Sequence, residues 1–170
     1  MNNRASHVKQ VYDFTTPLEG IERALSVASF DWDRISDDEV KFMMDGRWCE
    51  YKGFFEYCDD LDVIQMTCWA EGVFVGDRDV TEIAEFLLRV NEQLWIGHFS
   101  WDEEAQTITY RHTFLAHEAH NMEATVLVDV LDAAKIAFDR FRPFFQMLVT
   151  GEIGLQQSIN VAYMDTMGEA

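Results

Sequence analysis

The stretch AEFLLRVNEQLWIGHFSWDEEAQTITYRHTFL, residues 84–115, decides the fold class of this chain. In its first half, apolar residues recur every three or four positions, which is typical of one face of an amphipathic helix. That face begins one residue before the stretch and consists of Ile83, Phe86, Leu87, Val90 and Leu94. From Gly97 onward, apolar residues recur at every second position, and the acidic segment 102–105 interrupts this pattern as a turn would. The stretch therefore predicts a helix followed by a β-hairpin.

Extended segments precede this stretch, and they cover residues 30–35, 39–44, 47–57 and 61–71. The connections between them are short, and the connection at Asp45-Gly46 is a strong hairpin signal. A parallel crossover needs a connection of about a dozen residues or more. The short connections therefore predict an antiparallel meander.

Helices are also predicted at both ends of the strands. Pro17 suits a first helical position and opens an amphipathic helix over residues 17–29. The last helix is expected from about residue 122 to residue 142, with a continuation after Pro143 through residue 149. The predicted fold class is α+β, with a single antiparallel sheet and elements in the order α-β-β-β-β-α-β-β-α.

The chain is expected to form one domain. Its 170 residues, 48% of them hydrophobic, are enough to bury a single core. Residues 17–151 would form the domain, residues 1–16 an N-terminal tail, and residues 152–170 a C-terminal tail or short helix. No internal repeat or linker indicates a second domain.

The last helix carries more apolar side chains than one sheet can cover. A helix on a sheet needs an apolar arc of only about 100°, whereas here a narrow polar stripe leaves a broad apolar remainder. We expect a second subunit to cover the excess, and the alternative is a helix buried within its own chain. The side chains expected to face a second subunit or partner are Val126, Val130, Ala134, Phe138 and Phe141.

The charge balance is strongly acidic. The chain has 31 acidic and 13 basic residues, which gives a formal net charge of −18. Such a field repels phosphate backbones and anionic lipids, so nucleic acid and membrane surfaces are not expected as partners. It would attract a basic or amphipathic polypeptide, although solubility alone also accounts for it.

Cysteine usage and the absence of targeting signals indicate the cytoplasm. Cys49, Cys58 and Cys68 are odd in number and form no C-x-x-C pair, which suits reduced thiols. No apolar stretch approaches the roughly 20 residues that span a bilayer. The first 16 residues also lack the apolar core of a signal peptide.

No catalytic residue, metal site or cofactor is predicted. The segment 117–120 fails the H-E-x-x-H pattern because Asn121 stands where the second histidine belongs. The acidic segment 31–39 fails the calcium-loop pattern because Phe42 occupies the position of the bidentate glutamate. An enzyme is therefore not expected. The alternative is a small-molecule-binding sensor or enzyme with an apolar pocket on a curved sheet, lined by Tyr110, Arg111 and His112.

Two of the predicted strand regions, residues 48–55 and 61–69, carry apolar residues on both faces. A sheet covered by helices on one side would then present an aromatic second face to a partner. Methionine and tryptophan side chains could build such an adaptable surface, or they could belong to the core. These side chains are Met43, Met44, Met66, Met122, Met147, Trp48, Trp69, Trp95 and Trp101.

The block 84–115 resembles the YbjN family of bacterial proteins, and the resemblance extends from about residue 17 to residue 151. It implies an α+β fold like that of type III secretion chaperones, which are small, acidic, dimeric proteins that bind extended polypeptides. Members of the family are described as bacterial sensory transduction regulators, and the resemblance supplies no catalytic residues. The family's recurring positions fall on Asn91, Leu94, Gly97, Phe99 and Arg111.

We interpret these recurring positions as structural. Gly97 would let the chain leave the helix axis and enter a strand, and Asn91 would satisfy backbone groups at that junction. Together with the charge, the resemblance implies a non-catalytic, polypeptide-binding protein, chaperone-like or a regulatory adaptor. It is expected to act as a homodimer.

Overall fold

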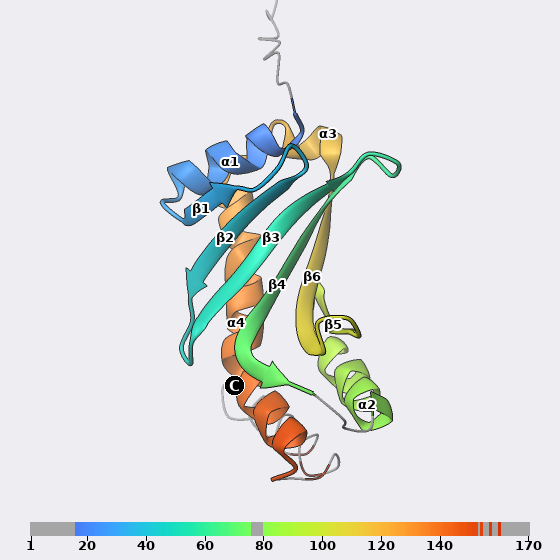
Figure 1. Ribbon diagram of the computed structural model, residues 1–170. Helices are drawn as coiled ribbons and strands as arrows, with labels where there is room; N and C mark the ends of the chain where they lie inside the picture. The colour runs from blue at the N-terminus through green and yellow to red at the C-terminus, as the bar shows by residue number, and fades with distance from the viewer. Residues whose placement is uncertain (1–15, 76–79, 153, 155–156, 158–159, 161–170) are drawn as a thin grey trace, which may run out of the picture.

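The computed structural model describes residues 16–75, 80–152, 154, 157 and 160 of the chain (Figure 1). The expected N-terminal tail, apart from residue 16, and most of the expected C-terminal tail lie outside the described residues. The elements are α1 (Leu18–Val27), β1 (Asp31–Arg34), β2 (Glu39–Asp45), β3 (Glu50–Cys58), β4 (Val63–Phe74), α2 (Val80–Asn91), β5 (His98–Asp102), β6 (Thr107–Leu115), α3 (Ala116–Ala119) and α4 (Ala124–Thr150). This is the predicted order, with the short helix α3 added before the last helix.

The strands form one six-stranded antiparallel sheet in the order β1-β2-β3-β4-β6-β5. The predicted α+β class, the meander of the first four strands and the later hairpin are confirmed. The hairpin joins the meander through β6, which pairs with β4, so β5 lies at an edge of the sheet. The register of β4 against β6 breaks between Trp69 and Phe74.

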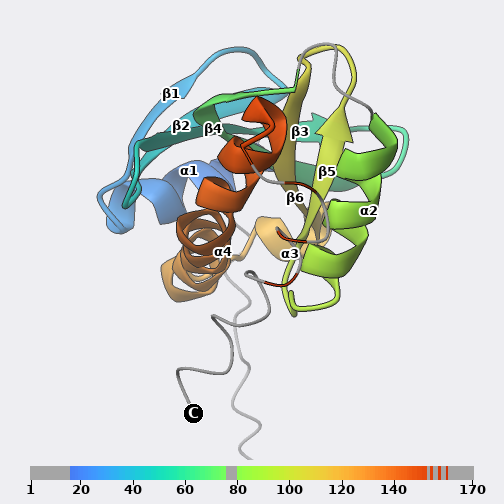
Figure 2. The same ribbon diagram turned by 90° about the horizontal axis from the view of Figure 1, so that it is seen from below.

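The helices lie on one side of the sheet (Figure 2). Successive strand residues point to opposite faces, so every second residue of each strand meets the helices. We call the face against the helices the covered face and the other the open face. No helix covers the open face within the part of the chain that the structure describes (Figures 1 and 2).

Aromatic side chains form the centre of the covered face. The ring of Phe99 on β5 lies 5.1 Å from the ring of Phe138 and 4.9 Å from the ring of Phe145, both on α4. The ring of Tyr51 on β3 stacks on Phe138 at 5.0 Å. All four side chains are buried. Such ring pairs add about 0.5–1.5 kcal/mol each to the stabilisation from burial.

The structure corrects the expectation about the apolar arc of the last helix. Val130, Ala134, Phe138 and Phe141 are buried within their own chain, and only Val126 of the five expected side chains is exposed, at 48%. The reason is that three surfaces cover α4. It packs on the sheet and on α1, and the edge-to-face contact of Phe145 with Phe86 joins it to α2. These four side chains therefore do not form a surface for a second chain.

Two polar residues of α4 tie the helix to the sheet instead of facing solvent. The Oδ1 atom of Asp139 accepts hydrogen bonds from the backbone N–H of Arg47 at 2.7 Å and from the hydroxyl of Tyr51 at 2.6 Å. The guanidinium of Arg142 donates to the carbonyl of Glu71 at 2.9 Å. Part of the polar stripe that the sequence shows along this helix therefore attaches α4 to the sheet. Burial and the neighbouring Asp139 carboxylate both raise the pKa of Tyr51.

Pro143 lies inside α4, which runs without a break from Ala124–Thr150. A helical proline cannot donate to the carbonyl four residues earlier, which here belongs to Asp139. That carbonyl accepts a hydrogen bond from the indole N–H of Trp48 at 2.7 Å. The expected interruption at residue 142 is therefore wrong, because a donor from the β2–β3 turn replaces the missing one.

Candidate functional site

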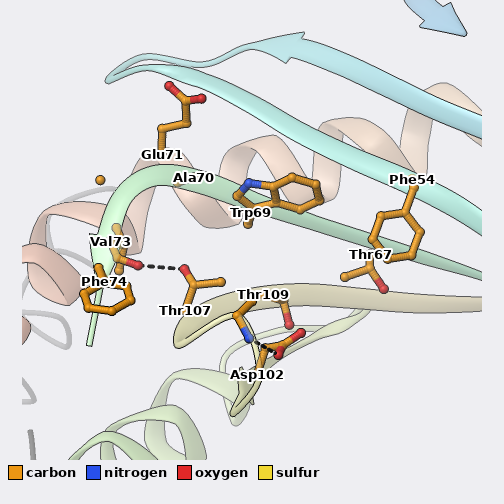
Figure 3. Close-up of a pocket in the computed structure, with 12 residues that line it drawn as sticks. Phe54, Thr67, Trp69, Ala70, Glu71, Val73, Phe74, Asp102, Thr107 and Thr109 are labelled. Carbon is orange, nitrogen blue, oxygen red and sulfur yellow. Dashed lines mark hydrogen bonds between the residues drawn. The ribbon is translucent and has the colours of Figure 1, made fainter. Parts of the chain in front are cut away.

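The open face presents a row of aromatic and hydroxyl side chains at its centre. In the strand register, Lys52 of β3 lies opposite Trp69 of β4, and Trp69 lies opposite Thr109 of β6. In the neighbouring row Phe54 lies opposite Thr67. All five positions alternate with residues of the covered face and so point away from the helices. Figure 3 shows Phe54 and Trp69 beside Thr67 and Thr109 on this face.

Two adjoining hollows lie on the open face, and we call them together the open-face groove. The first has a volume of 480 Å³, and its aromatic lining consists of Phe54, Trp69 and Phe74. The second has a volume of 280 Å³. The two share Phe54, Thr67, Asp102 and Thr109. The groove therefore crosses the sheet from β3 to β5.

A bend in β4 shapes the first hollow. Gly72 has a φ of +80°, a conformation in which glycine is favoured, and the register with β6 breaks there. Beyond the bend, the hydroxyl of Thr107 donates to the carbonyl of Val73 at 2.6 Å. The bend separates the rings of Trp69 and Phe74, and Phe74 remains 63% exposed. The bend thus opens the hollow that Phe54, Trp69 and Phe74 line (Figure 3).

Buried hydroxyl groups form the floor of the groove. Thr67 and Thr109 are only 7% and 3% exposed, although no described helix covers them. The hydroxyls of Thr109 and Ser100 are 2.9 Å apart and share a hydrogen bond. The aromatic rings beside these threonines exclude solvent from them. A hydroxyl has one donor and two acceptor sites, so the floor can also bond a ligand.

The rim of the groove is acidic. Four carboxylates and one guanidinium are found among the lining residues of the two hollows: Glu56, Glu71, Asp102, Glu103 and Arg111. Glu71 forms an ion pair with Lys52, which lowers the pKa of Glu71 and raises the pKa of Lys52. The guanidinium of Arg111 donates to the side chain of Gln65.

The structure divides the five recurring positions between two places. Asn91, Gly97 and Phe99 meet at the junction of α2 and β5, with Leu94 packed against the core nearby. Arg111 lies on the open face and lines the groove. In the small-molecule alternative Arg111 was expected to line a pocket together with Tyr110 and His112, whereas the alternation along β6 places it on the face opposite to theirs.

Asn91 closes part of the edge strand β5. Its carboxamide donates to the carbonyl of Phe99 at 2.9 Å and accepts from the N–H of Phe99 at 2.7 Å. These are the two hydrogen bonds that a further strand would make at this residue. Gly97 has a φ of +65°, and a side chain there would collide with the ring of Tyr110.

Tyr110, Arg111 and His112 do not converge on one pocket, because adjacent strand residues point to opposite faces. Tyr110 is buried on the covered face, where its hydroxyl donates to the carbonyl of Ile96 and burial raises its pKa. Burial and, to a smaller degree, the neighbouring His98 lower the pKa of His112. Burial raises the pKa of the Cys68 thiol, which is the opposite of what activates a nucleophile.

The described part of the chain contains no group of three or more histidine, cysteine, aspartate or glutamate side chains placed to hold a metal ion. Within the same residues, no helix is long and apolar enough to cross a membrane.

Helix α2 and the turn after it carry a second exposed apolar surface. Val80 and Leu88 lie on the outer side of the helix and are 45% and 68% exposed. Trp95 in the following turn is fully exposed, and Ile96 beside it is 38% exposed. The buried side of the same helix consists of Ile83, Phe86, Leu87 and Val90. The helix is therefore apolar on two sides.

Comparison with known proteins gives a family and two fold likenesses. The YbjN family, described as "Putative bacterial sensory transduction regulator", matches residues 17–147. No curated protein matches the sequence. A chain of the HopA1–SchA chaperone–effector complex is similar with a TM-score of 0.49 and 9% identity, over 73% of this chain and 92% of that chain. A chain of the ExsC–ExsE complex has a TM-score of 0.49 and 13% identity, over 77% and 94%.

Proposed function

The chain belongs to the YbjN family, and from the geometry of its open face we propose that it is a non-catalytic protein that binds a segment of another polypeptide. The observation that carries this proposal is the open-face groove. Three aromatic side chains, Phe54, Trp69 and Phe74, line a hollow on a sheet face that no described helix covers. A sheet face with unburied aromatic rings is a typical docking surface for a polypeptide.

The composition of the groove favours an amphipathic segment. The aromatic rings would contact apolar side chains, and the floor hydroxyls of Thr67 and Thr109 would bond the backbone or polar side chains of the segment. The acidic rim would attract basic residues and speed the encounter. The net charge of −18 acts in the same direction.

Homodimer formation is part of the proposal, and the outer side of α2 is the surface that supports it. Val80, Leu88 and Trp95 form an exposed apolar stripe there. Pairing this stripe with the same stripe of a second copy would bury it around a twofold axis, as in most homodimers. Replacing Leu88 with aspartate should shift the mass in solution from dimer to monomer, and replacing Ile136, exposed on α4, should not.

Two further expectations belong to this proposal. The first is that residues 17–151 act as one domain. The second is that the protein works in the cytoplasm, and the odd number of cysteines and the free state of Cys49, Cys58 and Cys68 support it. Oxidative cross-linking of the native protein inside cells would contradict the second expectation.

A small-molecule-binding role is the second candidate, because the volume of 480 Å³ falls in the range of ligand pockets. Native mass spectrometry of the purified protein distinguishes the two candidates. A stoichiometric small molecule that leaves when Phe74 is replaced with aspartate would favour the second.

A photo-cross-linking experiment tests the polypeptide proposal. The amino acid p-benzoylphenylalanine replaces Phe54 in the groove or, as a control, Ile136 on α4, and the full chain is irradiated in lysate of its source. We expect cross-links from position 54 to map to recurrent polypeptide segments. A synthetic peptide of such a segment should bind the wild-type protein and bind the Phe54→Asp variant at least tenfold more weakly. Equal cross-linking from both positions, or peptide binding that Phe54→Asp does not change, would contradict the proposal.

A further inference from the structure

The geometry of the first hollow points to a more specific partner chemistry, which rests on the proposed function. We propose that the groove selects an arginine side chain of the bound segment. Its guanidinium would lie against the indole of Trp69, between the carboxylates of Glu71 and Asp102.

The aromatic rings of the hollow offer a surface for a planar cation. The rings of Phe54 and Trp69 are 6.1 Å apart and tilted by 58°, and Phe74 lies on the other side of the bend. Guanidinium groups stack on aromatic faces, and tryptophan is the strongest acceptor. The protein itself contains such contacts. Arg47 lies 5.0 Å from the ring centroid of Trp48, and Arg140 lies 4.7 Å from that of Phe141.

The two carboxylates are on opposite sides of the indole. Glu71 lies on the β3 side of Trp69, and Asp102 lies beneath Thr109 on the β5 side (Figure 3). Lys52 contacts Oε1 of Glu71, and the N–H of Ala105 donates to Oδ1 of Asp102 at 2.9 Å. A carboxylate has two oxygens and about four acceptor sites, so both groups can accept further hydrogen bonds from a guanidinium. The ion pair with Lys52 keeps Glu71 ionised by lowering its pKa.

This combination distinguishes arginine from the other side chains that could enter. An aliphatic side chain would cover the rings but would desolvate the carboxylates without bonding them. Lysine would satisfy one carboxylate as a point charge, whereas the planar guanidinium can stack and donate in two directions at once. No lining residue of the first hollow is basic, and the charge of the nearby Lys52 ammonium is offset by its ion pair with Glu71.

The test uses four pools of decapeptides with mixed serine, threonine and valine positions, alike except that residue six is arginine, lysine, citrulline or norleucine. Binding to the full chain is followed through the indole N–H resonance of Trp69, assigned by its loss in Trp69→Phe. We expect the arginine pool to bind at least fivefold more tightly than the other three. Equal affinity for lysine, citrulline or norleucine would overturn the arginine inference and leave the proposed function standing. If none of the pools shifts any open-face resonance, both are overturned.

Variants of the hollow locate the effect. Trp69→Leu lacks the indole, so its binding is followed through the backbone amide resonances of Thr67 and Thr109, and it should abolish the preference for arginine. Asp102→Asn, which keeps an oxygen for the Ala105 N–H, should reduce the preference two- to fivefold. Asp129→Asn, exposed on α4, removes the same charge elsewhere and should change nothing. A preference that survives Trp69→Leu in a folded protein, verified by its far-ultraviolet spectrum, would overturn the inference. An equal loss in Asp129→Asn would overturn it too, because net charge alone would then explain the preference.

Discussion

The covered and open faces of the sheet carry similar side chains in opposite surroundings. On the covered face, the ring of Phe99 contacts the rings of Phe138 and Phe145 on α4. On the open face, the rings of Phe54 and Trp69 contact each other and line a hollow. The same strands supply both faces, since Met66 and Cys68 of β4 are buried on one side while Trp69 faces the other. Apolar alternation on both faces of a strand therefore does not show which face the helices cover.

Matched phenylalanine truncations should separate the two faces most strongly. Phe99→Ala removes a buried ring with partners on β6 and α4 and should cost about 3–5 kcal/mol of unfolding free energy. Phe54→Ala, on the half-buried open face, should cost about 1 kcal/mol or less. Chemical denaturation of both variants measures the difference. If the two variants lost similar amounts of unfolding free energy, Phe54 would have to be covered in solution by a molecule or segment that stabilises the fold.

A pair of glycine substitutions sharpens the comparison at two positions with the same backbone constraint. Gly97 and Gly72 both have positive φ, which costs an alanine about 1–2 kcal/mol. At Gly97 the new methyl group would also collide with the ring of Tyr110, whereas at Gly72 it would meet only Arg142, at an ordinary 3.5 Å. We expect a loss of about 2–4 kcal/mol for Gly97→Ala and about 1–2 kcal/mol for Gly72→Ala. A larger loss at Gly72, measured by thermal unfolding, would contradict this account.

The hydrogen bonds between Asn91 and the edge strand β5 offer a third test. Asn91→Ala leaves the N–H and the carbonyl of Phe99 without their partner and should cost about 1–3 kcal/mol. Hydrogen exchange should also show a less protected Phe99 amide. Glu104→Ala, in the exposed turn at the other end of the hairpin, serves as the control and should change stability by less than about 0.5 kcal/mol. Unchanged protection at Phe99 would show that the carboxamide bonds do not hold the edge.

Two histidines give the smallest effect, and it depends on pH. His112 lies on the covered face with a lowered pKa, so the unfolded chain binds more protons than the folded chain once the pH falls below about 6.5. Unfolding free energy should therefore fall from pH 7.5 to pH 5.5, and His112→Gln should reduce that fall. His98→Gln, on the open face, should leave the fall almost unchanged. Equal slopes for the wild type and His112→Gln would contradict the burial of the imidazole.

The sequence was sufficient for the order of the elements and the antiparallel class of the sheet. Periodicity and short connections are local properties, and they predicted the meander and the hairpin. The pairing of β6 with β4 depends on how the hairpin meets the meander, and no local pattern encodes it. The prediction that a second subunit covers the apolar arc of α4 was wrong for a related reason. Its cover comes from α1, α2 and the sheet together, so the excess over one sheet did not require a second chain.

The groove could be anticipated only in outline. The apolar residues on both faces of the strands favoured an aromatic open face, and Trp69 lies there. The hollow itself depends on the bend at Gly72 and on the register break with β6, which bring Phe74 and Asp102 to the same place. The attachment of Asp139 and Arg142 could not be anticipated, because the sequence does not reveal that the β2–β3 turn and the β4 bend reach them.

The bond between Trp48 and the Asp139 carbonyl couples two positions far apart in the chain. If Pro143 became alanine, its backbone N–H could donate to the Asp139 carbonyl. The carbonyl would then no longer depend on the Trp48 indole for a hydrogen bond. If Trp48 changed first, the Asp139 carbonyl would lose its donor while Pro143 still could not supply one, although the Arg47 N–H would still bond the Asp139 carboxylate. The order of the two substitutions thus decides whether the intermediate sequence is tolerated. Lineages descending from this chain should retain the tryptophan for as long as they retain the proline.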